Sequence, residues 1–269
     1  MTVPHSARIW NYWLGGKDNY PVDREAGDAW MATDPSIVDI ARAARAYLIR
    51  VVAYLAGPAG VHQFIDVGTG LPTTSNTHEV AQSIAPDARV IYVDNDPMVL
   101  AHARALLVGT PGTTSYVEAD MTDTATIIKQ AAELLDFDQP IALMFMGILG
   151  HLPDLNTARA VVRELLDPLP PGSYLALYDD TLPLDPAARD RMQQAQQTYA
   201  ETGAVPYWSR PSGDIASLFG GLNLVDPGFV RIPLWRPGTV PGENRLRTLH
   251  AFPSGQTHVA AYGGVARKT

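Results

Sequence analysis

Strand and helix patterns alternate from Val61 to Glu201, and this alternation limits the possible folds more than any other feature of the chain. The strand segments are mostly continuous apolar runs, as expected when helices cover both faces of a sheet. We expect strands at 61–67, 89–94, 113–119, 140–146 and 173–179, and helices at 74–84, 97–107, 122–135, 156–166 and 186–201. Short connections between such elements indicate βαβ crossovers, so we predict an α/β fold with a doubly wound, mostly parallel sheet.

The segment before the first strand is predicted to contain a long helix over DPSIVDIARAARAYLIRVVAYLAGP, residues 34–58. Its apolar residues fall on one helical face, Asp34 can cap its start, and Gly57-Pro58 ends it. Arg42 and Arg45 are expected to point away from the apolar face. The residues before this helix are aromatic and charged and show no sustained period.

The C-terminal part has a different pattern, because FVRIPLW (229–235) and HVAAYGGVA (258–266) are two strand-like segments without a helix between them. Such strands are most simply antiparallel neighbours. We therefore interpret residues 1–57 as an N-terminal helical extension or lid and residues 58–269 as one ligand-binding domain, together forming one compact unit.

Composition excludes several classes of partner. The formal net charge is -8 at pH 7, with scattered arginines, which argues against nucleic acid as the main partner. The sequence contains no cysteine, which excludes disulfides, a thiolate nucleophile and a Cys-ligated metal. No apolar run is long enough to span a bilayer, and the N-terminus lacks a signal-peptide core, so we expect a cytoplasmic protein that does not bind membranes.

Three acids follow successive predicted strands: Asp66, Asp94 and Asp120. In an open parallel sheet, ligands bind beyond the carboxyl ends of the strands. Gly68 and Gly70 come directly after Asp66, and glycines at such a turn allow close approach of a ligand to the backbone. A strand-to-helix turn that needs positive φ would also explain these glycines.

The chemistry of the three acids suggests a nucleoside with a charged tail. A carboxylate at Asp94 can accept from both hydroxyls of a ribose, and Asp120 can accept from the exocyclic amine of an adenine. The backbone of Asn95 or Met121 can meet the adenine ring, and Asp66 can hold an ammonium group.

A dinucleotide-binding fold is the main alternative for the same residues, since Gly68, Gly70 and an acid further along the chain also suit NAD. Against NAD, the Asp66 carboxylate would repel a pyrophosphate, and Thr73 stands at the third position of the glycine fingerprint, where Gly or Ala is expected.

FIDVGTG, VIYVDNDP and VEADM together resemble the first three motifs of the class I S-adenosylmethionine-dependent methyltransferases. The N-terminal ARIWNYWLGGKDNYPVDREAGD resembles the opening signature of the actinobacterial S-adenosyl methyltransferase family. The resemblance covers nearly the whole chain and implies a Rossmann-like, seven-stranded sheet of order 3-2-1-4-5-7-6. It also implies S-adenosylmethionine as cofactor and S-adenosylhomocysteine as product. Leu71-Pro72 departs from the general pattern, which often has a third small residue there.

The resemblance also assigns site residues. Asp66, Gly68, Thr69 and Gly70 would line the methionine end of the cofactor, Asp94 would hold the ribose, Asn95, Asp120 and Met121 would border the adenine, and Gly147, in MGILGHLPD, would flank the sulfonium. In LGGKDNY, Lys17 and Asn19 would lie near the methionine carboxylate, with Tyr12 packed nearby, as part of a lid; a surface turn is the alternative.

Two catalytic candidates follow the fourth and fifth strands. His151 could be a general base, or a packing or helix-capping histidine, and Asp179 with Asp180 could orient an acceptor. A divalent metal on Asp179, Asp180 and Asp154 is a further alternative, but we predict no metal site.

The sequence therefore predicts an enzyme that transfers a methyl group from S-adenosylmethionine to a small-molecule acceptor. A sulfonium methyl is already activated, so such an enzyme mainly has to align donor and acceptor. The alternative in a different class is a non-catalytic protein that senses or carries S-adenosylmethionine.

Overall fold

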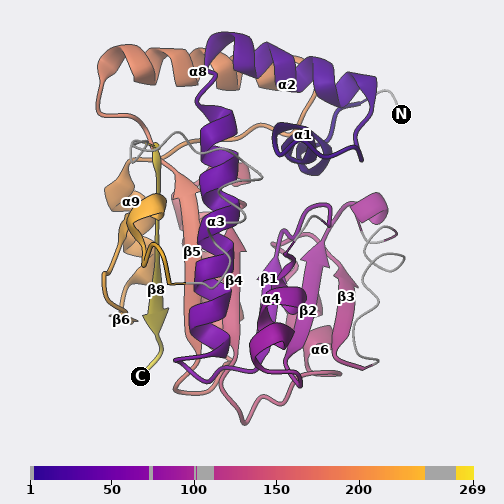
Figure 1. Ribbon diagram of the computed structural model, residues 1–269, viewed down its shortest axis with the longest axis vertical. Helices are drawn as coiled ribbons and strands as arrows, with labels where there is room; N and C mark the ends of the chain where they lie inside the picture. The colour runs from indigo at the N-terminus through magenta and orange to yellow at the C-terminus, as the bar shows by residue number, and fades with distance from the viewer. Residues whose placement is uncertain (1–2, 73–74, 100, 102–111, 240–258) are drawn as a thin grey trace.

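The computed structural model describes residues 3–72, 75–99, 101, 112–239 and 259–269 (Figure 1). Within them the sheet has eight strands in the order β3-β2-β1-β4-β5-β8-β6, and β7 also pairs with β8. The strands are β1 (Gln63–Val67), β2 (Arg89–Asp94), β3 (Thr114–Glu118), β4 (Ala142–Met146), β5 (Tyr174–Asp180), β6 (Asn223–Leu224), β7 (Val230–Arg231) and β8 (Ala261–Arg267). The predicted doubly wound, mostly parallel sheet is confirmed.

The register of the parallel strands brings their carboxyl ends to one edge of the sheet. Val67 at the end of β1 pairs with Val93 of β2 and with Phe145 of β4. Asp94 at the end of β2 pairs with Glu118 of β3. The three predicted acids, in or just after these strand ends, therefore lie along one edge of the sheet.

Two helical layers cover the faces of the sheet, and each has its own apolar cluster. On one face α3 (Ile37–Ala56) and α4 (Thr77–Ile84) pack against inward residues such as Phe64 and Tyr92. On the other face α6 (Thr124–Ala131) and α7 (Leu155–Leu166) pack against residues such as Ile65 and Ile91. This burial on both faces explains why the strands are continuously apolar. Most of the helix expected at 97–107 lies outside the described residues.

A third group of helices crosses the carboxyl end of the sheet (Figure 1). It consists of α1 (Ser6–Trp13), α2 (Pro21–Thr33) and α8 (Pro186–Glu201). The ring of Trp30 lies 5.6 Å from that of Trp13 and 5.2 Å from that of Tyr199, so one aromatic cluster joins all three helices. A buried ion pair of 2.8 Å between Arg8 and Asp23 adds a second link between α1 and α2. We call α1, α2 and α8 the cover.

The structure adds one detail to the predicted N-terminal part and corrects two. The residues before the long helix form α1 and α2 although their sequence shows no sustained period. The long helix begins at Ile37 with Ser36 as its N-cap, because the Asp34 carboxylate accepts hydrogen bonds from the Ser36 amide and hydroxyl instead of capping the helix. Arg45 is not turned away from the protein but lines a cavity.

The C-terminal strands pair as expected but are shorter than predicted. β7 is antiparallel to β8, which confirms the predicted pairing. The strand predicted at 229–235 is wrong beyond Arg231, because Ile232–Leu234 form a 3-10 helix around Pro233, which has no N–H for a ladder. The eighth strand is β6, a two-residue segment that the sequence did not indicate. Residue 258 lies outside the described part, and β8 starts at Ala261.

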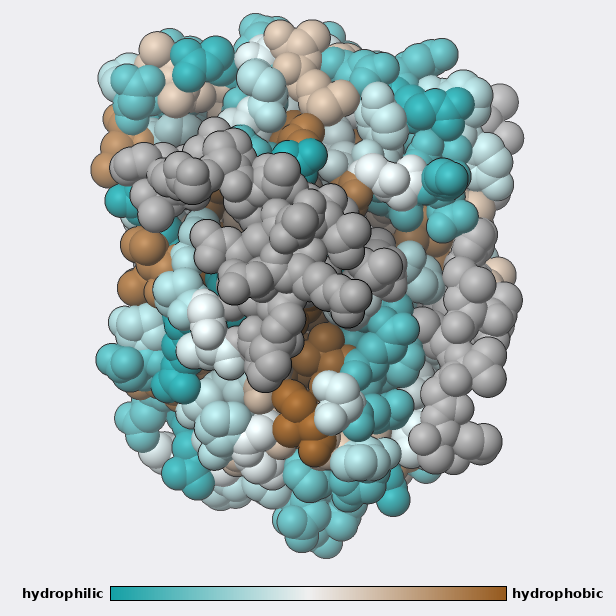
Figure 2. Space-filling view, in the orientation of Figure 1, coloured by the Kyte–Doolittle hydropathy of each residue, from teal (hydrophilic) through white to brown (hydrophobic). Residues whose placement is uncertain are grey.

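The described helices include none that is both long and apolar enough to cross a membrane. On the face shown in Figure 2 the described surface is mainly hydrophilic, and apolar side chains gather only in separate small patches.

Candidate functional site

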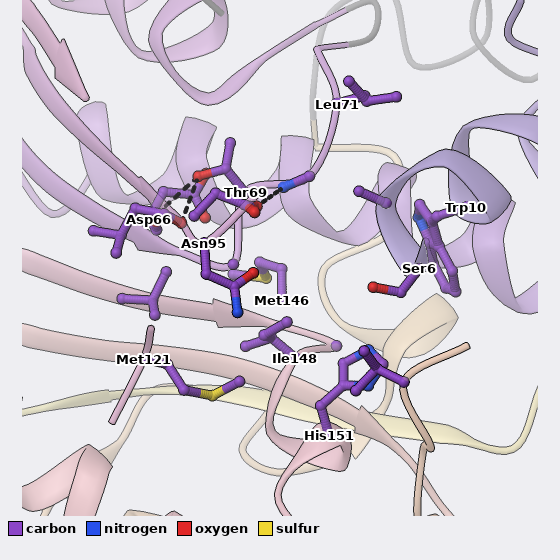
Figure 3. Close-up of a pocket in the computed structure, with 18 of the residues that line it drawn as sticks. Ser6, Trp10, Asp66, Thr69, Leu71, Asn95, Met121, Met146, Ile148 and His151 are labelled. Atoms are coloured by element: carbon purple, nitrogen blue, oxygen red, sulfur yellow. Dashed lines mark hydrogen bonds between the residues drawn. The ribbon is translucent and has the colours of Figure 1, made fainter. Parts of the chain in front are cut away.

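A cavity of about 260 Å³ lies between the carboxyl ends of the strands and the cover. Its walls come from the loops after β1 to β4, from the first turns of α1 and from the middle of α3. The main lining segments are 5–7, 44–45, 66–71, 93–95, 119–121 and 146–148. Ser6, Trp10 and His151 lie at the end of the cavity away from Asp66 and Met121 (Figure 3).

The glycine turn after β1 has a fixed geometry before any ligand binds. Gly68 and Gly70 have φ of 72° and 67°, in the left-handed region that favours glycine. The amides of Gly68 and Thr69 donate to the Val93 carbonyl, at 2.8 and 3.2 Å. The amide of Gly70 donates to Oδ2 of Asp94 at 2.8 Å. The N–H groups of Gly68, Thr69 and Gly70 therefore all donate to acceptors within the protein.

Asp66 is a buried acid whose carboxylate lines the cavity. Its Oδ2 accepts a 2.6 Å hydrogen bond from the hydroxyl of Thr77, at the start of α4. Burial disfavours the charged form and raises the pKa of Asp66 to about 6. A cationic ligand group beside Asp66 would favour the ionised form and lower this pKa.

Asp94 accepts hydrogen bonds from two loops and keeps further acceptor positions for a ligand. Its Oδ2 accepts from Gly70, and its Oδ1 accepts from the Asp96 amide at 3.0 Å. Because a carboxylate offers about four acceptor positions, these two bonds leave capacity for ligand hydroxyls. Burial raises the pKa of Asp94, so a hydrogen-bond donor on its carboxylate would be stabilising.

Asn95 and Asp120 form the next part of the wall. The Asn95 amide donates to Oδ2 of Asp120 at 3.2 Å, and the amide and hydroxyl of Thr122 donate to its Oδ1. Burial raises the pKa of Asp120, but the hydrogen bonds from Thr122 and Asn95 outweigh this effect, and the pKa lies below its ordinary value. Asp120 is therefore an ionised acceptor beside Met121, which also lines the cavity.

Three residues predicted for the lid do not line the cavity: Tyr12, Lys17 and Asn19. The Tyr12 hydroxyl donates to Asp28 at 2.7 Å, Lys17 is exposed, and the Asn19 amide donates to Oδ1 of Asn11 and to the Gly16 carbonyl. The LGGKDN segment instead forms a tight turn that links α1 to α2.

This turn is built around Asn11, which sequence reasoning did not single out. Oδ1 of Asn11 accepts from the Asp18 amide and from Asn19, and Asn11 itself lines the cavity. A Cβ at position 16 would come within 2.4 Å of the Asn11 side chain, which explains the glycine there. The signature therefore shapes the cover, and α1 supplies the residues that reach the cavity.

His151, one of the two catalytic candidates, lines the cavity. Its Nδ1 lies 2.9 Å from the Pro206 carbonyl, and its ring packs edge-on against Tyr207 at 5.1 Å. Because a carbonyl only accepts, Nδ1 carries the proton, and the neutral ring has its lone pair on Nε2. Burial lowers the pKa of His151, which favours the neutral form.

Asp179, the other candidate, is buried beside the cavity but does not line it. It accepts a hydrogen bond from the Tyr207 hydroxyl, and Arg210 lies 3.9 Å from its Oδ2. Asp154 caps α7 by accepting from the Thr157 amide. Among the described residues, no group of three or more His, Asp or Glu side chains is placed to hold a metal ion.

The sequence analysis missed Arg45, His5 and Trp10, which all line the cavity. Arg45 lines the cavity together with Ala44 and Leu48 of α3, and helical periodicity gave no signal for it, because it placed Arg45 off the apolar stripe. His5 and Trp10 depend on how α1 folds back over the sheet, which no local pattern indicates.

Comparison with known proteins gives the following matches. The sequence model of the family described as S-adenosyl methyltransferase matches residues 1–269. A crystal structure of a DUF574 family protein from Streptomyces avermitilis is 41% identical, with a TM-score of 0.88, and the match covers 99% of this chain and 98% of that one. A structure from Thermobifida fusca, provisionally described as a methyltransferase, is 38% identical, with a TM-score of 0.86, and the match covers 100% and 96% of the two chains.

A more distant structure shares the fold. The plantazolicin methyltransferase BpumL, crystallised with S-adenosylhomocysteine and a substrate analog, is 12% identical to this chain, with a TM-score of 0.52. That match covers 98% of this chain and 96% of BpumL. A comparison with curated proteins gives no match.

Proposed function

The chain belongs to the S-adenosyl methyltransferase family, with S-adenosylmethionine as its cofactor, and we propose that it methylates a small-molecule acceptor bound under α1. The observation that carries this proposal is one continuous cavity that joins Asp66, Asp94 and Asp120 to His151 and the apolar residues of α1. The cofactor and the family that the sequence resembles are confirmed. We further propose that residues 1–57 lie over the binding domain of residues 58–269, and that α8 of this domain packs against them to complete the cover.

The residues at the strand ends fit the adenosine part of the cofactor. Asp94 would accept from the two ribose hydroxyls, since both of its oxygens keep acceptor capacity beside the bonds from Gly70 and Asp96. Asp120 would accept from the adenine amine, and Asn95 with Met121 would border the ring.

The turn after β1 fits the methionine part. Asp66 is a buried carboxylate whose ionised form a cation would stabilise, and the ammonium group of the cofactor would be such a cation. Gly68, Thr69 and Gly70 would contact the chain of the methionine through backbone atoms that side chains leave open. Gly147, at the end of β4, would flank the sulfonium, because it lines the cavity next to Met146 and Ile148.

The acceptor would lie where the cavity meets α1. Trp10, Leu14, Leu152 and Val205 give this part an apolar wall, and His151 adds a polar group. A bound cofactor supplies an activated methyl group on sulfur. The protein would hold the acceptor in line with the S–CH₃ bond and exclude water. His151 would take the acceptor proton on Nε2 as the new bond to carbon forms and the bond to sulfur breaks.

The alternatives to an enzyme are not favoured. A sensor would be expected to fill the space beside the sulfonium with side chains, whereas the cavity continues there. An NAD protein would offer free N–H groups at its glycine turn, but the three amides here are bonded to Val93 and Asp94.

Calorimetric titration of the full chain with S-adenosylhomocysteine and with NAD tests the placement of the cofactor. We expect S-adenosylhomocysteine to bind and NAD to bind much more weakly. Equal affinity for NAD would contradict the proposed site. A screen of small phenols and amines with methyl-labelled S-adenosylmethionine would then test methyl transfer. The role of His151 would be supported if His151→Ala loses the wild-type turnover but still binds S-adenosylhomocysteine.

A further inference from the structure

Arg45 is a cation that lines the cavity and has no role in the proposed cofactor and acceptor sites. It lies in the middle of α3, is half-buried and lines the cavity together with Ala44 and Leu48. An arginine in this position is costly because its charge is removed from most of the solvent.

The other buried arginines are well bonded. Arg8 pairs with Asp23 at 2.8 Å, Arg50 donates to the carbonyls of Trp235 and Ile232 at 2.7 Å each, and Arg210 donates to the Leu149 carbonyl at 3.0 Å. For Arg45, by contrast, the described part of the chain provides no hydrogen bond and no ion pair. Burial lowers the pKa of Arg45, and Asp66 is the carboxylate that most opposes this shift. The guanidinium stays charged at neutral pH, and the described residues give it no hydrogen-bonded partner.

The amides of the glycine turn are not free to bind an anionic group of a ligand. A carboxylate near Asp66 would need donors, and the amides of Gly68, Thr69 and Gly70 already donate to Val93 and Asp94. The Gly147 amide also donates within the protein, to the Tyr178 carbonyl at 3.0 Å. Lys17, the cation expected to meet a carboxylate, is exposed and does not line the cavity.

We propose that Arg45 binds the carboxylate of the amino-acid end of the cofactor, while Asp66 binds its ammonium group. The two side chains line the same cavity and carry opposite charges, which matches a zwitterion. A guanidinium can hold a carboxylate through two parallel hydrogen bonds, and these are strong because both groups are charged. This inference rests on the proposed position of the cofactor, with its methionine end at the turn after β1.

The test compares two ligands that differ in the amino-acid end. S-adenosylhomocysteine has this end, and 5′-methylthioadenosine lacks it but keeps the adenosine and the sulfur. We expect Arg45→Met to weaken S-adenosylhomocysteine binding about ten- to a hundred-fold, the range for a lost charge-assisted hydrogen bond. Its affinity for 5′-methylthioadenosine should change by less than about twofold, because the carboxylate is absent. Arg45→Lys keeps the charge and should recover part of the loss.

Arg42→Met is the matched control, because Arg42 lies on the same helix and pairs with Asp39 at 3.9 Å outside the cavity. It should leave the affinity for both ligands unchanged. Wild-type affinity for S-adenosylhomocysteine in Arg45→Met would overturn the assignment, and so would an equal loss for both ligands, which would indicate a structural role. Failure of the wild-type protein to bind S-adenosylhomocysteine would instead overturn the proposed function itself.

Discussion

Nδ1 of His5 lies 3.2 Å from Oδ2 of Asp96, so the start of α1 lies against the loop that follows β2. Arg8 approaches the same oxygen at 3.5 Å and also pairs with Asp23. The amide of Asp96 donates to Asp94, the proposed ribose acid. One short loop therefore connects the cover to the cofactor wall.

The first prediction concerns this connection. Asp96→Asn removes the charge that faces His5 and Arg8 but keeps an oxygen that can accept from the Met98 amide, as Oδ1 does now. We expect α1 to detach more often, at a cost of about 1 kcal/mol for a partly buried ion pair. Limited proteolysis should cut the N-terminal 20 residues faster, and S-adenosylhomocysteine should slow the cutting.

Asp87→Asn serves as its control, because Asp87 pairs with His62 at 3.3 Å and both side chains are exposed. Equal cutting rates in wild type and Asp96→Asn would show that the His5–Asp96 contact does not hold the cover.

The second prediction tests the ribose assignment of Asp94. Asp94→Ala removes the acceptor of both hydroxyls, so S-adenosylhomocysteine should bind about ten- to a hundred-fold more weakly. Asp94→Asn keeps one acceptor and should lose less. Titration with free adenine is the internal control, because adenine carries no ribose and its binding should be similar in all three proteins. A folded Asp94→Ala protein with wild-type affinity would remove Asp94 from the site.

The third prediction uses the raised pKa of Asp66, about 6. Ionised Asp66 is the form that pairs with an ammonium group, so the affinity for S-adenosylhomocysteine should increase from pH 5 to pH 7 with a midpoint near this pKa. Asp66→Asn should bind weakly at every pH and lose this dependence. An unchanged pH profile in Asp66→Asn would assign the titration to another group.

The raised pKa of Asp66 also affects the stability of the ligand-free protein, and this gives the fourth prediction. The folded pKa lies above the unfolded value of about 3.9, so between these values the folded state holds more protons than the unfolded state. The contribution of Asp66 to the free energy of unfolding therefore falls as the pH rises from about 4 to about 6, by on the order of 3 kcal/mol. Denaturant unfolding at both pH values should show a smaller decrease for Asp66→Asn than for the wild type.

The fifth prediction separates two glycines of the turn. Both have positive φ, but a Cβ on Gly68 would lie 2.3 Å from the side chain of Ile148, whereas a Cβ on Gly70 meets nothing closer than 4.0 Å. Gly70→Ala should cost the backbone strain alone, about 1–2 kcal/mol, and Gly68→Ala should cost more. Thermal unfolding of the two variants checks the order, and equal melting temperatures would contradict it.

The sequence predicted the strand ends of the sheet well, because they depend on local patterns. Apolar runs that end in acids place Asp66, Asp94 and Asp120 at one edge of a parallel sheet, and all three line the cavity. Glycine spacing likewise indicated a close approach, which the positive φ of Gly68 and Gly70 supports.

The rest of the site depends on contacts between distant segments. Lys17 and Asn19 were predicted near the cofactor from their polar character, but the turn that they form bonds to Asn11 instead. Arg45 was assigned to the outer side of its helix from helical periodicity, which cannot reveal that α1 and the strand ends leave a cavity beside α3. Tertiary packing decides both cases.

The two walls of the cavity come from different parts of the chain. The strand-end segments 66–71, 93–95 and 119–121 line the proposed cofactor side, and α1 with Ile148, His151, Leu152 and Val205 lines the proposed acceptor side. Substitutions at Trp10, Leu14 or Val205 can therefore reshape one side without disturbing the hydrogen bonds that fix the other. Such a division lets selection change which compound is methylated while the donor stays the same. Relatives with the same strand-end acids but different residues at these three positions should therefore differ in acceptor and not in cofactor.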